Sequence, residues 1–218
     1  MLYPLPKSPY CVILGNGEYP PISISKNLIA GANLTVCSDG GANFAWHNEL
    51  IPDLIIGDLD SIHDQARQHY TDLKVLITAL KSQEQNDLEK SLNYITDRYS
   101  FNSFVLLGFL GLREDHSYAT LQIVEKQTSP AVFQVYSKTA EYLILPPGDY
   151  EFHFPVKHRL SVFAMPEAGN LTTTGLKWNL SGATLSRGSR GLSNISIKSA
   201  VHFSFDSGKI LLIHLFQF

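Results

Sequence analysis

The fold is indicated most clearly by one stretch, Ile55-Ile56-Gly57-Asp58-Leu59-Asp60-Ser61. Its first residues are apolar and β-branched, a pattern typical of a buried strand. Two aspartates follow almost directly, so their carboxylates lie at the carboxyl end of that strand, where open α/β sheets bind ligands. Two acidic groups there repel each other unless a cation joins them, and carboxylate oxygens suit Mg²⁺. If the backbone stays extended, Asp58 and Asp60 point to one side and Leu59 to the other.

Apolar runs on either side of this stretch predict a mostly parallel sheet with helices on both faces. The expected strands are residues 10–14, 34–38, 54–56, 74–77, 103–107 and 132–136. The clearest helix covers residues 87–99, where Leu88, Leu92, Ile95 and Tyr99 recur at helical spacing. Asn86 can cap this helix, with Glu89 three residues later, and a second helix is expected at 117–126.

The pattern changes after about residue 137, where the turn Pro146-Pro147-Gly148-Asp149 precedes short alternating segments. These segments are residues 151–154, 159–164, 183–185, 195–199, 201–205 and 210–215, with Asp206-Ser207-Gly208-Lys209 as an expected hairpin turn between the last two. Such alternation predicts a small antiparallel β-sandwich or barrel. We therefore expect two domains, a three-layer α/β domain at 1–137 and a β-sandwich at 138–218.

Composition limits the classes of ligand. The net charge of −3 gives no general attraction to nucleic acid or to anionic membranes, so an anionic ligand must be held by a metal ion, helix N-termini or single basic residues. The two cysteines, Cys11 and Cys37, lie inside apolar runs and are expected to be buried thiols. No secretory signal pattern and no run of membrane-spanning length is visible, so a cytoplasmic location is expected.

Four loops that follow expected strands carry glycine and polar residues. They are Gly15-Asn16-Gly17, Asp39-Gly40-Gly41-Ala42-Asn43, residues 57–61, and residues 108–116 with Arg113, Asp115 and His116. Parallel strands place all four loops at one sheet edge, where glycines let backbone N–H groups approach phosphate oxygens. The chain contains neither a P-loop nor a dinucleotide-binding glycine motif.

Three residues each allow two interpretations. Asp87 either stabilises the dipole of its helix or is a third carboxylate at the metal. Asp115 forms either a surface ion pair with Arg113 or a carboxylate near the reacting groups, with Arg113 on a phosphate. Trp178 is either a core residue or a stacking platform for a flat ligand, with residues 188–194 as hydrogen-bonding neighbours.

In this order, these segments resemble the thiamine pyrophosphokinase (thiamine diphosphokinase) family over nearly the whole chain, and residues 188–191 are similar to its bacterial branch. The segments that carry the resemblance are Asn16-Gly17-Glu18, Asp39-Gly40-Gly41-Ala42-Asn43, Gly57-Asp58-Leu59-Asp60-Ser61, Asn86-Asp87-Leu88-Glu89-Lys90, Arg113 with Asp115-His116, Thr173-Thr174-Gly175-Leu176-Lys177-Trp178-Asn179-Leu180, and Gly188-Ser189-Arg190-Gly191-Leu192-Ser193-Asn194.

The sequence departs from the family pattern at four positions. Asn86 replaces a threonine, Glu84 an aspartate, Leu112 a glycine and Thr120 an asparagine. The four aspartates of the pattern are all present, so the departures bear mainly on the loop around Arg113.

The resemblance implies a homodimer that converts ATP and thiamine to AMP and thiamine diphosphate, with the active site between subunits. The first domain would hold ATP and Mg²⁺, and the second would help to bind thiamine. Catalytic roles fall to Asp58, Asp60, Asp87 and Asp115, the first three as Mg²⁺ ligands and the last as a base or as an orienting group. The residues implied for ATP are Asn16, Asp39, Gly40, Gly41, Ala42, Gln83, Arg113 and His116, and those for thiamine are Trp178, Leu192, Ser193 and Asn194.

Two other functions stay open. One is a related diphosphotransferase that acts on another flat heterocycle, such as a hydroxymethylpterin, but the segment around Trp178 favours thiamine. A non-catalytic thiamine-binding or regulatory protein would be expected to lack one or more of the aspartates, and none is missing.

Overall fold

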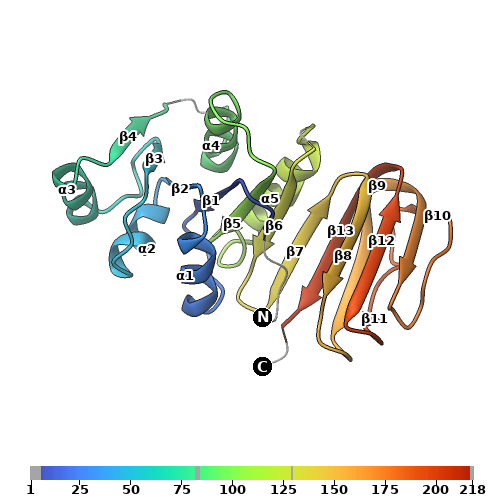
Figure 1. The fold of residues 1–218 in the computed structure, drawn as a ribbon. Helices are drawn as coiled ribbons and strands as arrows, with labels where there is room; N and C mark the ends of the chain where they lie inside the picture. The colour runs from blue at the N-terminus through green and yellow to red at the C-terminus, as the bar shows by residue number, and fades with distance from the viewer. Residues whose placement is uncertain (1–5, 82–83, 129, 217–218) are drawn as a thin grey trace. The chain divides into compact units, whose positions relative to one another are not determined.

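Two units make up the computed structural model, which describes residues 6–81, 84–128 and 130–216 (Figure 1). The first, here called the α/β unit, comprises residues 7–123 and 135–138. The second, the β unit, comprises mainly residues 124–134 and those from 139 onward. Helix α5 (Glu114–Lys126) and strand β6 (Val132–Tyr136) have residues in both.

Five parallel strands form the sheet of the α/β unit, in the order β4-β3-β2-β1-β5. They are β1 (Tyr10–Leu14), β2 (Leu34–Ser38), β3 (Leu54–Gly57), β4 (Leu76–Ala79) and β5 (Ser103–Leu107). The remaining helices of the unit are α1 (Ile22–Ala30), α2 (Gly41–His47), α3 (Asp64–Asp72) and α4 (Asp87–Thr96). Because the strands are parallel, the loops after β1, β2, β3 and β5 leave the sheet at one edge.

The sequence pattern located most of these elements, with three corrections. Strand β4 begins at Leu76, two residues later than expected. Helix α4 buries Leu88, Leu92 and Ile95 as predicted, but it ends at Thr96, so Tyr99 is exposed and stacks on Phe101 instead. Helix α5 begins at Glu114 rather than at residue 117, because two acidic residues suit its first turn.

The β unit contains antiparallel strands in the order β7-β13-β9-β12-β8, with β10 and β11 also paired to β9. They are β7 (Ala140–Leu145), β8 (Gly148–His153), β9 (Arg159–Thr174), β10 (Ala183–Ser186), β11 (Asn194–Ile195), β12 (Ala200–Phe205) and β13 (Ser207–Leu215). Alternate residues of these strands form one apolar core, which includes Leu143, Val162, Phe203 and Leu212. The expected fold class, parallel α/β followed by antiparallel β, is confirmed.

The β unit differs from the prediction in three details. Only the first six residues of the long strand β9 were expected as a strand, and β7 was not expected at all. The expected hairpin at residues 206–209 is wrong, because β12 and β13 pair with different parts of β9 and not with each other. Gly208 explains this path: at φ 79° it lies so close to β9 that an added Cβ would clash with the carbonyl oxygen of Glu167.

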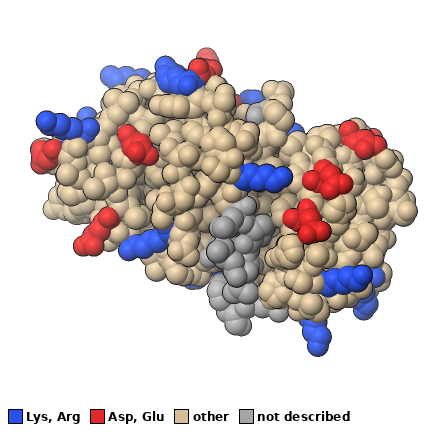
Figure 2. All heavy atoms as spheres, viewed as in Figure 1, with Lys and Arg blue, Asp and Glu red and all other residues tan. Residues whose placement is uncertain are grey.

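Charged side chains are interspersed over the coloured surface in Figure 2, and no broad basic face is seen in that view. This mixed distribution of charge agrees with the net charge of −3, which gives no general attraction to anions. Among the described residues, no helix is long and apolar enough to cross a membrane.

Candidate functional site

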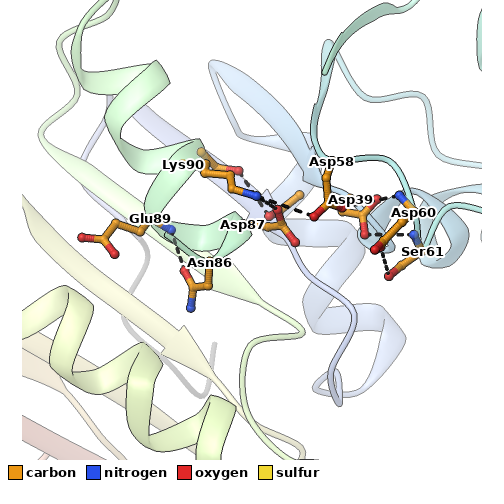
Figure 3. Close-up of polar contacts among 10 residues, drawn as sticks. Asp39, Asp58, Asp60, Ser61, Asn86, Asp87, Glu89 and Lys90 are labelled. Carbon is orange, nitrogen blue, oxygen red and sulfur yellow. Dashed lines mark hydrogen bonds and ion pairs between the residues drawn. The ribbon is translucent and has the colours of Figure 1, made fainter. Parts of the chain in front are cut away.

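Three aspartates from different parts of the α/β unit form a cluster at the carboxyl edge of its sheet (Figure 3). Asp39 follows β2, Asp58 follows β3, and Asp87 is the first residue of α4. Each offers one carboxylate oxygen within 4.8 Å of the other two. Asn86 fixes the start of α4, because its side-chain oxygen accepts the backbone N–H of Glu89 at 2.9 Å. The predicted N-cap is thus confirmed, and it places Asp87 in the cluster.

Asp39 is the most buried carboxylate of the cluster, with 4% of its surface exposed. Its Oδ2 accepts the backbone N–H of Ser61 at 3.2 Å, while its Oδ1 is buried and has no hydrogen-bond partner within the described parts of the chain. Burial raises the pKa of Asp39, the hydrogen bond from Ser61 lowers it, and the nearby charges of Asp87 and Asp58 raise it further. A buried oxygen in this state is unfavourable, and a bound cation would satisfy it.

Lys90 is a functional candidate that the sequence analysis missed. Its side chain is only 5% exposed, and its Nζ lies 3.1 Å from Asp87 Oδ1 and 3.7 Å from Asp58 Oδ2. Figure 3 shows the ammonium group reaching between the two carboxylates. The signal in the sequence was the spacing, because residues three apart on a helix share a face. With all groups ionised, three carboxylates and one ammonium leave a charge of −2, which suits a divalent cation.

Asp60 lies beside this cluster rather than in it. Strand β3 ends at Gly57, and Leu59 adopts φ 66°, so the extended backbone that would align Asp58 and Asp60 is absent. The turn leaves Asp60 exposed, with its carboxylate accepting a hydrogen bond from the Ser61 hydroxyl at 2.9 Å. The cluster is therefore Asp39, Asp58 and Asp87, where the sequence predicted Asp58, Asp60 and Asp87 as metal ligands.

Glycines bring the loops after β1 and β2 into direct contact. An added Cβ on Gly41 would lie 2.0 Å from the carbonyl oxygen of Leu14, and one on Gly40 would lie 2.7 Å from the side chain of Asn16. Three of the residues expected to bind ATP, Asn16, Gly40 and Gly41, thus lie together, and Ala42 is buried in α2 behind them.

The loops after β1 and β5 are also joined, by backbone hydrogen bonds. Gly15 N–H donates to Leu107 O at 2.7 Å, and Gly17 N–H donates to Gly108 O at 2.6 Å. Asn16, between these two glycines, is thereby fixed to the loop that leads to Arg113.

Arg113 and Asp115 form a bidentate ion pair at the start of α5, with distances of 3.1 and 2.5 Å. Both side chains are exposed, and His116 beside them is exposed as well. The hydrogen bond from Arg113 lowers the pKa of Asp115 to about 2. Leu112, which replaces the family's glycine, is 75% exposed and has φ 59°, a conformation that glycine adopts readily. Gln83, also expected at ATP, lies outside the described residues.

A pocket of about 440 Å³ lies within the β unit. All four residues expected to bind thiamine line it: Trp178, Leu192, Ser193 and Asn194. Trp178 is 56% exposed, so its interpretation as a core residue is wrong. The pocket is also lined by the apolar side chains of Val162, Leu176 and Leu180, which suit contact with a flat ring.

Comparison with known protein families gives two matches. Residues 25–134 match the model of the thiamin pyrophosphokinase catalytic domain, which covers the acidic cluster and the loops after β2, β3 and β5. Residues 150–210 match the model of the thiamin pyrophosphokinase vitamin B1 binding domain, which covers the pocket.

Individual relatives agree with these matches. Thiamine pyrophosphokinase 1 and 2 of Oryza sativa subsp. japonica are 29% and 30% identical to this chain, covering 94% and 90% of it and 87% and 81% of their own lengths. The fold is similar to that of thiamine pyrophosphokinase from Bacillus subtilis, with a TM-score of 0.82 and 23% identity over 96% of this chain and 100% of that one. Thiamin pyrophosphokinase from Candida albicans gives a TM-score of 0.73 at 17% identity, over 95% of this chain and 89% of that one.

Proposed function

The chain belongs to the thiamine pyrophosphokinase family and is a thiamine diphosphokinase, and on that premise we propose how its residues perform the reaction. The diphosphate group of ATP is transferred to the hydroxyl of thiamine, which gives thiamine diphosphate and AMP. The observation that carries this proposal is the cluster of Asp39, Asp58 and Asp87 with its buried, unpartnered oxygen.

The cluster fits Mg²⁺ by its chemistry. Its donors are hard carboxylate oxygens, its charge with Lys90 is −2, and Asp39 Oδ1 has no partner among the described residues. We assign Asp39, Asp58 and Asp87 to the ion, with Asp60 close enough in the chain to contribute through water. When bound, Mg²⁺ neutralises charge on the phosphate oxygens. Lys90 keeps Asp58 and Asp87 in place and adds a positive charge beside the transferred group.

ATP is bound by the loops that leave the same sheet edge. Asn16 and the backbone N–H groups of Gly40 and Gly41 face its phosphates. Ala42 supports this loop, since its own N–H donates to Asp39 O at 3.0 Å, and Gln83 and His116 complete the set. Arg113 is suited to a phosphate because its guanidinium already makes a bidentate contact with the carboxylate of Asp115. When a phosphate of ATP takes over part of the contact between Arg113 and Asp115, the Asp115 carboxylate becomes available to the hydroxyl of thiamine.

Asp115 orients the thiamine hydroxyl for attack on the β-phosphorus of ATP. The bond from this oxygen to the β-phosphorus forms as the bond to the AMP oxygen breaks, and the hydroxyl proton passes to water. Because Arg113 stays partly paired with Asp115 and lowers its pKa, Asp115 is ionised in the neutral range and is a weak base. A carboxylate in that state accepts a hydrogen bond well, and correct placement of the attacking oxygen supplies much of the rate in phosphoryl transfer.

Thiamine occupies the pocket of the β unit. The indole of Trp178 stacks on one of its rings, a contact worth on the order of 0.5–2 kcal/mol. Ser193 supplies a hydrogen bond to the polar edge of the pyrimidine, and Leu192 adds apolar contact. This pocket favours thiamine over another heterocycle as the acceptor, because a vitamin B1 binding domain match covers it.

The first experiment supplies ATP, thiamine and MgCl₂ and quantifies products by chromatography. Thiamine diphosphate and AMP are expected in equal amounts, and EDTA should abolish both. Formation of ADP and thiamine monophosphate would contradict diphosphate transfer, and preferred use of a hydroxymethylpterin would contradict the acceptor. Asp58→Asn should lower kcat by about 100-fold or more, whereas Asp64→Asn, which removes an exposed carboxylate of α3, should not.

We also propose a cytoplasmic homodimer whose active site joins the cluster of one subunit to the pocket of its partner. Support comes from the family resemblance. Mixing the Asp58→Asn and Trp178→Ala variants, at a thiamine concentration so low that Trp178→Ala alone has little activity, tests it, because a mixed dimer then keeps one intact site. Random exchange should restore about a quarter of the wild-type activity. No recovery after subunit exchange would place both halves of the site in one subunit.

A further inference from the structure

Asn194 uses its side chain to hold the backbone of Trp178. Its Oδ1 accepts the Trp178 N–H at 3.1 Å, and its Nδ2 donates to the Trp178 carbonyl oxygen at 2.7 Å. Oδ1 also accepts the N–H of Ile195 at 2.9 Å. An asparagine amide has two N–H donors and two acceptor lone pairs, so three of its four positions are occupied within the protein. With 7% of its surface exposed, Asn194 has little capacity left for a ligand.

The surrounding backbone strengthens this arrangement. Asn194 lies in β11, which is paired with β9, so the amide projects from a fixed strand. Lys177 N–H donates to Ile195 O at 2.8 Å, and the loop closes on itself through Leu176 N–H and Asn179 Oδ1 at 3.1 Å. The Trp178 segment is therefore tied to β11 through Lys177 as well as through Trp178 itself.

The indole itself is mostly exposed, yet it has a neighbour. The Lys177 ammonium lies 4.5 Å from the centroid of the Trp178 ring, and this cation–π contact favours one orientation of the indole. Lys177 is not among the residues that line the pocket, whereas Trp178 is. The ring is thus presented to the pocket before any ligand arrives.

The neighbouring residue, Ser193, differs from Asn194 in the hydrogen bonds of its side chain. Its backbone N–H donates to Ser161 Oγ at 3.1 Å, but its exposed hydroxyl has no hydrogen-bond partner among the residues that the structure describes. Its backbone adopts φ 61°, a strained conformation for a serine, and such strain is often retained where a side chain must be aimed. Of these two neighbouring residues, only Ser193 has its polar group available.

From this contrast we propose that Asn194 is a positioning residue, which acts on thiamine through Trp178 and does not bind it directly. The inference rests on the proposed thiamine pocket and changes the role of one of its residues. A platform that is held in place loses less freedom when a ring stacks on it, so the amide lowers the entropy cost of binding. Removing the amide should raise the thiamine KM while the KM for ATP stays unchanged.

A double-mutant cycle separates this role from direct contact. Asn194→Ala should raise the thiamine KM about tenfold in the wild-type background and less than about twofold in Trp178→Ala, because its effect passes through the indole. Ser193→Ala, the matched control, should keep its full effect in both backgrounds. If Asn194→Ala has its full effect in Trp178→Ala, Asn194 binds thiamine itself and the inference is overturned. If Trp178→Ala leaves the thiamine KM unchanged, the proposal that thiamine binds in this pocket fails together with the role proposed for Asn194.

Fluorescence gives a second measurement that a general loss of folding would not mimic. In a Trp46→Phe background, Trp178 is the only tryptophan, and its emission reports the indole alone. Asn194→Ala should lower its steady-state anisotropy in the absence of thiamine, while far-ultraviolet circular dichroism stays unchanged. Asn194→Asp keeps both acceptor contacts but places a carboxylate oxygen against the Trp178 carbonyl oxygen, so it should also lower the anisotropy and raise the thiamine KM. Wild-type anisotropy in both variants would refute the positioning role.

Discussion

Replacement of Asp39 by asparagine should stabilise the metal-free protein, although Asp39 belongs to the proposed metal site. The ionised carboxylate is buried, its Oδ1 has no partner in the described chain, and Asp58 and Asp87 repel it. Asparagine keeps an oxygen for the N–H of Ser61 and places an NH₂ group where Oδ1 lies, facing the two carboxylates. It also tolerates the backbone, since asparagine is among the residues most often found at positive φ, which is 44° here.

The expected gain follows from these contacts. A buried, unsatisfied polar atom costs about 1–3 kcal/mol, so removing it should raise the free energy of unfolding by about 2 kcal/mol. For a chain of this length, 1 kcal/mol corresponds to about 2–4 °C in Tm, which predicts an increase of about 4–8 °C. Asp60→Asn is the matched control, because Asp60 is exposed and its carboxylate has a partner; its Tm should change little.

The stability that Asp39→Asn gains over the wild type should also depend on pH and should increase as the pH rises. The raised pKa of Asp39 means that the folded protein binds this proton more tightly than the unfolded chain. The wild type therefore loses stability as pH rises from the unfolded value, about 3.9, through the folded one, and asparagine does not titrate. The advantage of Asp39→Asn should be absent below this window and complete above it.

Thermal unfolding in EDTA measures the effect, followed by the emission of Trp46 in the α/β unit in a Trp178→Phe background. Added Mg²⁺ should raise the Tm of the wild type and leave that of Asp39→Asn nearly unchanged. A lower Tm for Asp39→Asn in EDTA at neutral pH would refute the argument, because the carboxylate would then be satisfied without a metal.

Two further predictions use the same measurement. Lys90→Met leaves Asp58 and Asp87 without their shared cation, but those carboxylates are 24% and 33% exposed, so solvent screens part of the loss. The free energy of unfolding in EDTA should therefore fall by about 1–2 kcal/mol, and added Mg²⁺ should restore most of it. Recovery by Mg²⁺ no larger than that of the wild type would contradict the charge balance proposed for the cluster. Leu112→Gly should raise the free energy of unfolding by up to about 1 kcal/mol, because it relieves the left-handed strain at φ 59°, while Leu112→Ala keeps the strain and should give no gain. A Tm for Leu112→Gly below that of Leu112→Ala would show that this conformation is not strained.

Local sequence signals located the elements and many of the candidate residues. Buried strands such as β1 and β5 are continuous apolar runs, and α4 combines helical spacing with a capping asparagine, so each signal lies within a few neighbouring residues. The hairpin at residues 206–209 failed because its path depends on Gly208 meeting β9, some forty residues away in the chain. Likewise, the exposed state of Trp178 depends on what packs around it, which composition does not reveal.

The sequence by itself determined the parallel α/β and antiparallel β classes, and its motifs indicated the family and the edge where the acidic loops meet. Only the tertiary structure decided which side chains meet there. It placed Asp39 and Lys90 in the cluster with Asp58 and Asp87, left Asp60 beside it, and turned the amide of Asn194 toward Trp178. The physical reason is that carboxylate contacts of a few ångströms depend on backbone angles, such as φ 66° at Leu59, and on strands brought together from distant parts of the chain. Residue type sets the chemistry of a side chain, but packing sets its partners.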